Sequence, residues 1–138
     1  MKKQNSSGFR EIEHKADRAI EAWAPDLQGL FVQAAAGMHT LMGIEMLPGP
    51  MVTHQLLLEA LDRESLLVSF LSELLYLIET RSLACEVADF QFSETALRAH
   101  LVAKPILKMQ RQIKAVTFHN LEIKNESGLL SVTLIFDV

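Results

Sequence analysis

Residues 26–42 read DLQGLFVQAAAGMHTLM, and this stretch decides the first element of the fold. Asp26 stands directly before the apolar pattern, and an aspartate side chain is a preferred N-cap of a helix. Apolar residues then recur at helical spacing, which predicts a helix that buries one stripe of side chains. The stripe consists of Leu27, Leu30, Phe31, Ala34, Ala35, Met38, Leu41 and Met42.

The rest of the chain predicts one more helix and a set of strands. The second helix runs from about Arg63 to Glu79, with Asp62 as its N-cap. Pro105 is expected to interrupt the strand pattern. Two helices with mostly antiparallel strands predict an α+β fold in a single domain, with both helices packed on one face of the sheet. The expected strands are 9–13, 16–24, 52–61, 84–92, 96–103, 113–123 and 129–137.

Length, charge and cysteine content exclude several classes of protein. The 138 residues favour one domain at 9–138, preceded by a flexible polar tail at 1–8. The net charge of −4 argues against independent binding of nucleic acid. Cys85 is the only cysteine, which excludes a Cys-rich zinc site and fits a reducing, cytoplasmic setting. No apolar run approaches the ~20 residues of a membrane helix, so no membrane contact is expected.

Acidic residues lie at both ends of the patterned region. Residues 13–17 read EHKAD, and the chain ends on Phe136, Asp137 and Val138. Carboxylate oxygens are the ligands that Mg²⁺ and Ca²⁺ prefer, so Asp17 and Asp137 would hold a divalent cation if the fold brought them together. The alternative is that both are solvated charges at strand ends, which is the commoner role of such aspartates.

Three stretches together resemble the archease family. They are residues 13–17 with the sequence EHKAD, 114–121 with KAVTFHNL, and 135–138 with IFDV. The family pattern reads Asp-His-Thr-Ala-Asp near the start, Lys-Ala-Val-Thr-Tyr-His late, and Asp-Val at the very end. The two expected helices also resemble those of the family, so the resemblance extends over residues 9–138.

The resemblance implies a partner and a role. Archeases assist an RNA ligase of the RtcB type, which joins RNA ends in tRNA splicing and repair through a ligase–guanylate intermediate. The archease accelerates guanylation and supports multiple turnover, and it is not itself the ligase. For this chain the resemblance therefore implies a non-catalytic accessory protein that reaches tRNA or other RNA only through the ligase.

The resemblance also implies a metal site. Carried over position by position, its ligands are Asp17, Asp137 and Val138, the last through main-chain or terminal oxygens. Lys114 would belong to the same functional corner. The residue types do not distinguish Ca²⁺, Mg²⁺ and Mn²⁺. Glu13, His14 and His119 are possible functional neighbours, although a structural histidine or a solvated strand face explains the two histidines nearly as well.

Departures from the family pattern leave other functions open. Glu13 replaces aspartate, Lys15 replaces threonine, and Arg18 stands where the family has an aliphatic residue. One alternative is a small metal-dependent hydrolase that uses Glu13, His14, Asp17 and Asp137, although the sequence contains no nucleophile motif and no glycine-rich phosphate loop. The other is a chaperone or modulator of RNA-modification enzymes such as methyltransferases, a role also attached to this family.

Overall fold

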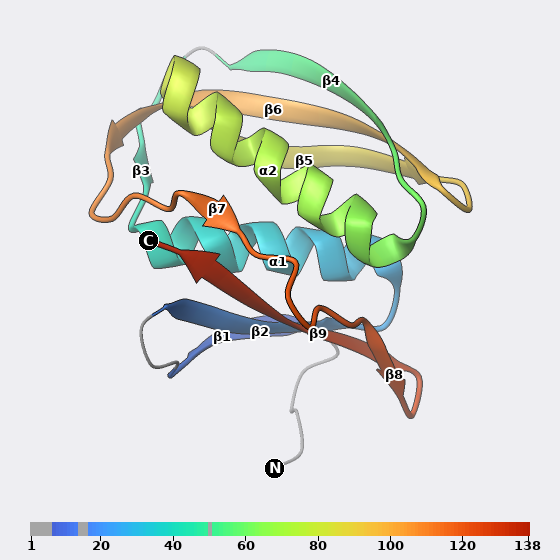
Figure 1. Cartoon of the computed structure of the whole chain (residues 1–138). Coiled ribbons are helices and arrows are strands. Elements are labelled where there is room, and N and C mark those ends of the chain that lie inside the picture. The colour runs from blue at the N-terminus through green and yellow to red at the C-terminus, as the bar shows by residue number, and fades with distance from the viewer. Residues whose placement is uncertain (1–6, 14–16, 50) are drawn as a thin grey trace.

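The computed structural model describes residues 7–13, 17–49 and 51–138. The elements are β1 (Gly8–Ile12), β2 (Arg18–Ala24), α1 (Leu27–Met42), β3 (Glu45–Met46), β4 (Val52–Glu59), α2 (Arg63–Arg81), β5 (Leu83–Phe92), β6 (Ala96–Lys108), β7 (Ala115–Val116), β8 (Lys124–Glu126) and β9 (Leu129–Asp137). Figure 1 shows the helices between two sheets. The helix α1 contacts both β2 and β5, and α2 contacts both β5 and β7.

The strands pair antiparallel throughout both sheets. The first sheet has the order β1-β2-β9-β7, and β8 also pairs with β9. In the second sheet β6 pairs with β3, β4 and β5. The last strand of the chain is therefore an inner strand of the first sheet, with β2 on one side and β7 and β8 on the other.

Both helices begin and end as their sequences indicate. The carboxylate of Asp26 accepts from the Gly29 amide at 2.7 Å, and Asp62 caps α2 through Ser65 at the same distance. Gly43 closes α1 with a φ of 65°, a left-handed conformation that glycine adopts without steric cost. The predicted helices are confirmed, and α2 extends two residues beyond the predicted end at Glu79.

Aromatic packing joins the helices to the second sheet. The ring of Phe31 on α1 lies 5.5 Å from that of Phe70 on α2 and 5.1 Å from that of Phe92 on β5. On its other side α1 approaches the first sheet so closely that a Cβ at Gly37 would lie 2.5 Å from the end of the Ile20 side chain. The core therefore runs continuously from sheet to sheet through the helix layer.

The α+β class and the antiparallel pairing are confirmed, and the strands divide into two sheets with the helices between them. Two local predictions are wrong. The strand β6 continues through Pro105, which has no N–H to donate. The Pro105 carbonyl accepts from the Leu47 amide and the Ile106 amide donates to the Ser82 carbonyl, so the pairing resumes around the missing N–H.

Among the described residues, no helix is long and apolar enough to span a membrane.

The second wrong prediction is the continuous strand at 113–123, where only Ala115–Val116 pairs with β9. The chain then turns, with the Leu121 amide donating to Phe118 and Asn120 at a φ of 57°. Asparagine tolerates this left-handed conformation better than most residues. The turn lets the Ile123 amide reach the Glu64 carboxylate on α2 at 2.9 Å. On this path Ile123 is buried.

Candidate functional site

The strand register brings the start of β2 and the end of β9 together at one end of the first sheet. Strand β2 pairs with β9 so that Arg18 stands opposite Phe136. Asp17 directly precedes Arg18 and Asp137 directly follows Phe136, so both aspartates lie one residue beyond the last β2–β9 pair. We call Asp17, Asp137 and Val138 the carboxyl corner.

The aspartates of the carboxyl corner are accessible to solvent to different extents. Side chains alternate between faces along a strand, and Phe136 is fully buried toward the helices. Asp137 therefore points to the outer side of the sheet. Asp137 is exposed and Asp17 is half-buried. An ion in solution can reach the corner.

Lys114 reaches the corner through its main chain. Its amide donates to the carbonyl of Asp137 at 2.7 Å, and Ala115 pairs with Asp137 in the β7–β9 ladder. The Lys114 side chain is exposed. The late motif and the chain end, which the sequence joined only by resemblance, are therefore bonded to each other.

The oxygen donors of the corner fit a hard divalent cation. Two carboxylates, with the terminal carboxylate of the adjacent Val138, form an all-oxygen set of the kind that Mg²⁺, Ca²⁺ and Mn²⁺ accept. Within the described ranges no three His, Cys, Asp or Glu side chains lie close enough to hold a metal.

The other predicted site residues lie in different places. Glu13 is exposed and follows β1, where Ile12 pairs with Ala19, so it lies at the same end of the sheet. His14 lies outside the described residues, as does Lys15. His119 is exposed in the turn after β7. Since β7 runs away from the corner along β9, the structure does not bring His119 to it.

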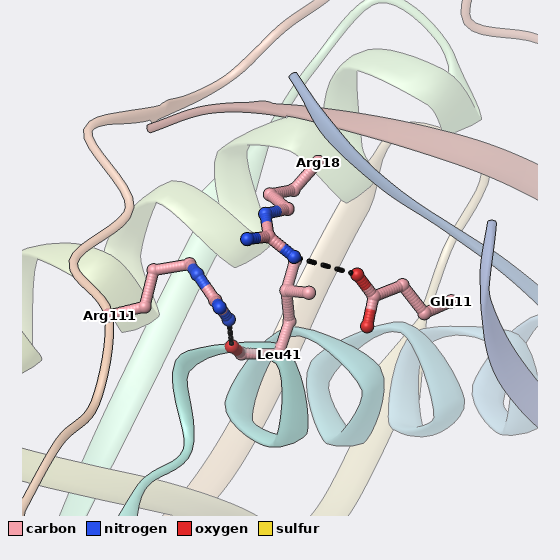
Figure 2. A network of polar contacts seen from close by, with 4 residues as sticks. All are labelled: Glu11, Arg18, Leu41 and Arg111. Carbon is pink, nitrogen blue, oxygen red and sulfur yellow. Dashed lines mark hydrogen bonds and ion pairs between the residues drawn. The ribbon is translucent and has the colours of Figure 1, made fainter. Parts of the chain in front are cut away.

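Arg18 points away from the carboxylates of the corner. Its Nη1 donates to the Glu11 carboxylate at 3.1 Å on the inner side of the sheet, as Figure 2 shows. Because the guanidinium is directed to Glu11, it does not occupy the place of a metal between the aspartates.

Arg111 is a part of this region that sequence reasoning missed. Its Nη1 donates to the carbonyl of Leu41 at 2.6 Å, in the last turn of α1. The amides of Gln110 and Arg111 both donate to the carbonyl of Met42, at 2.9 and 3.0 Å. A single arginine between two expected strands carries no periodic signal, so only the fold reveals this bond.

Two buried titratable groups lie away from the corner. Burial lowers the pKa of His39 to about 4, and its Nε2 is covered without a hydrogen-bond partner. Burial raises the pKa of the Cys85 thiol to about 11, which keeps it protonated and makes it a poor nucleophile.

A hollow of about 540 Å³ lies between β4 and the β5–β6 hairpin, and none of the predicted site residues lines it.

Comparison with known proteins decides the family. The model of the Archease protein family (MTH1598/TM1083) matches residues 9–138. The chain belongs to the archease family. Protein archease of Methanothermobacter thermautotrophicus is 29% identical over 138 residues, which cover 95% of this chain and 99% of the relative. Protein archease of Methanosarcina mazei is 28% identical and covers 94% of this chain and 95% of its own length.

Solved archease structures share the fold. The solution structure of protein 1598 of Methanobacterium thermoautotrophicum has a TM-score of 0.71 at 28% identity and covers 95% of this chain and 99% of its own. The crystal structure of an archease described as a "possible chaperone", from Thermotoga maritima, has a TM-score of 0.70 at 20% identity and covers 94% and 96%. The arrangement of two helices and antiparallel sheets is thus the archease arrangement.

Proposed function

We propose that this archease activates an RtcB-type RNA ligase by promoting its guanylation and its multiple turnover. The observation that carries the proposal is the convergence of Asp17, Asp137 and the Lys114 main chain at one end of the first sheet. The partner and the reaction are inferred from membership of the archease family, and this convergence supports the carboxyl corner as the proposed place of action.

The residues of the corner have separate roles in this proposal. Asp17, Asp137 and the terminal carboxylate would hold a divalent ion, and such an ion would supply positive charge to phosphate oxygens during guanylate transfer. Pairing of β9 with both β2 and β7 fixes Asp137 in place. Lys114 offers an exposed ammonium at the same end of the sheet, where it would contact phosphate oxygens or an acidic side chain of the ligase.

The ligase, in this proposal, supplies the catalytic groups and the contact with RNA. The chain itself carries a net charge of −4, which disfavours unaided binding of a phosphate backbone. We therefore propose a non-catalytic, cytoplasmic accessory protein whose contact with tRNA is indirect. Either delivery of the ion or conformational resetting of a stalled ligase would produce the same gain in turnover.

The direct test is guanylation of the cognate ligase with GTP and Mn²⁺ at catalytic amounts of this protein. The parent chain should raise turnover, and the double variant Asp17→Asn with Asp137→Asn should lose that effect, because isosteric amides bind a divalent ion poorly. Asp89→Asn is the matched control, since Asp89 is an exposed aspartate on β5 in the other sheet. Full activation by the double variant would overturn the role of the corner.

A second candidate is a chaperone role, which the description of the Thermotoga maritima archease as a possible chaperone favours. In that case the partner would be an RNA-modification enzyme such as a methyltransferase. Affinity capture from the source cell separates the two: recovery of the ligase supports activation, and recovery of a methyltransferase without the ligase supports the chaperone role.

A further inference from the structure

A short segment connects the last turn of α1 to the carboxyl corner. We call residues 110–114 the strap. At one end, the Gln110 and Arg111 amides bond to the carbonyl of Met42. At the other end, the Lys114 amide bonds to the carbonyl of Asp137 at 2.7 Å. Between them Ile113 is buried, so the strap is fixed on the inside as well.

The helix end that receives the strap is closely fitted to it. A Cβ at Gly43 would lie 2.8 Å from side-chain atoms of Gln110, so any other residue here would displace that side chain and would also have to adopt a φ of 65°. The last carbonyls of a helix lack partners within the helix and carry partial negative charge. The Arg111 guanidinium meets that need at Leu41 with a bond of 2.6 Å.

We propose that Arg111 is a positioning residue for the carboxyl corner. Its side chain fastens the strap to α1, and the strap in turn fixes the end of β9 where Asp137 and Val138 lie. The inference rests on the proposed function, because it assumes that the corner binds a divalent cation. It goes further in assigning to a residue outside the corner the task of holding the ligands in place.

If Arg111 acted only through its charge, its removal would change the metal affinity in the opposite direction. A guanidinium near a cation site repels the ion, so its removal should tighten binding if charge were the whole effect. A positioning residue instead weakens binding when it is removed, and loss of supporting bonds around metal ligands typically costs about 10- to 100-fold in affinity. Whether metal binding becomes tighter or weaker when Arg111 is removed therefore separates the electrostatic role from the positioning role.

Arg18 is the matched control that the chain provides. Figure 2 shows both arginine side chains near the last turn of α1, with Arg18 directed to Glu11 and Arg111 to the Leu41 carbonyl. Arg18→Gln thus removes one positive charge of the same kind from this region and leaves the Arg111–Leu41 bond of the strap in place.

The experiment is Mn²⁺ titration by calorimetry of the parent chain, Arg111→Gln, Arg111→Lys and Arg18→Gln. We expect a dissociation constant about tenfold higher for Arg111→Gln, a smaller rise for Arg111→Lys, and an unchanged or lower value for Arg18→Gln. Equal or tighter binding by Arg111→Gln would overturn the inference. Thermal unfolding of each variant shows that the comparison is made between folded proteins.

Amide hydrogen exchange without metal gives the independent readout. Arg111→Gln should speed exchange at Lys114, whose amide bonds to Asp137, and should leave Ala60, whose amide bonds to Thr95, unchanged. Unchanged exchange at Lys114 would overturn the role of Arg111. If the parent chain bound no Mn²⁺, the proposed metal corner would fail, and this exchange measurement would still decide whether Arg111 holds the strap.

Discussion

His39, in the last turn of α1, shows how burial of one side chain makes stability depend on pH. The residue as a whole is half-buried, but its Nε2 is covered and has no hydrogen-bond partner. A proton on this ring would add a charge without a partner, which is why burial lowers the pKa of His39 to about 4 from an ordinary value of 6.5.

The direction in which His39 changes stability with pH follows from the linkage between proton binding and folding. The folded state favours neutral His39, so the stabilisation is complete above pH 6.5 and is lost as the pH falls from there toward about 4. Between about pH 7 and about pH 5 the free energy of unfolding should fall by about 2 kcal/mol from this residue. Urea unfolding at both pH values measures it. His39→Gln should show a correspondingly smaller fall, and an equal fall in parent and variant would contradict the assignment.

Single-residue roles could be predicted from the sequence where they depend on neighbours along the chain, as the helix caps do. Asp26 and Asp62 were predicted as caps and bond to the amides expected. Glu11, Arg18 and Arg111 were not predicted as partners of anything, because an ion pair or a carbonyl contact across the fold leaves no pattern along the chain. The metal role of Asp17 and Asp137 stays a prediction, although the register brings the two together.

The cap of α1 leads to a prediction at the scale of the element. Asp26→Ala leaves the Gly29 amide without its side-chain acceptor, and loss of such a cap typically costs about 1 kcal/mol. Denaturant unfolding should show that loss in the free energy of unfolding. Gln28→Ala, an exposed position in the same turn, is the control and should change stability little or raise it slightly. Equal stability of the two variants would contradict the capping role.

Helices were predicted more closely than strands for a physical reason. The apolar stripe of α1 is a local pattern, and its N-cap is three residues from the amide it satisfies. The course of 113–123 depends instead on contacts with distant elements, namely the Glu64 carboxylate and β9. Pro105 lies inside β6 because neighbouring strands supply the bonds around it, which its own sequence context does not show.

At the scale of the whole molecule, the accessory role and the alternative hydrolase function predict different results in a phosphoester assay. The described residues gather two aspartates and a chain terminus at the corner, without a cluster of three metal-binding side chains. Because we propose an accessory role, we expect the purified chain with Mn²⁺ to release no product from a simple phosphoester such as p-nitrophenyl phosphate. Metal-dependent turnover that disappears in Asp17→Asn would instead favour the hydrolase and would contradict the accessory role.

The inner position of β9 has a consequence for how the chain reaches its fold. The strand β2 emerges early in synthesis, yet its partner β9 is the last strand made, so β2 waits with one edge unpaired until the chain is almost complete. Pairings between distant segments form slowly, and unpaired edges recruit other chains. A truncation that removes β9 would leave β2, β7 and β8 without their shared partner, and incomplete chains should aggregate rather than fold partially.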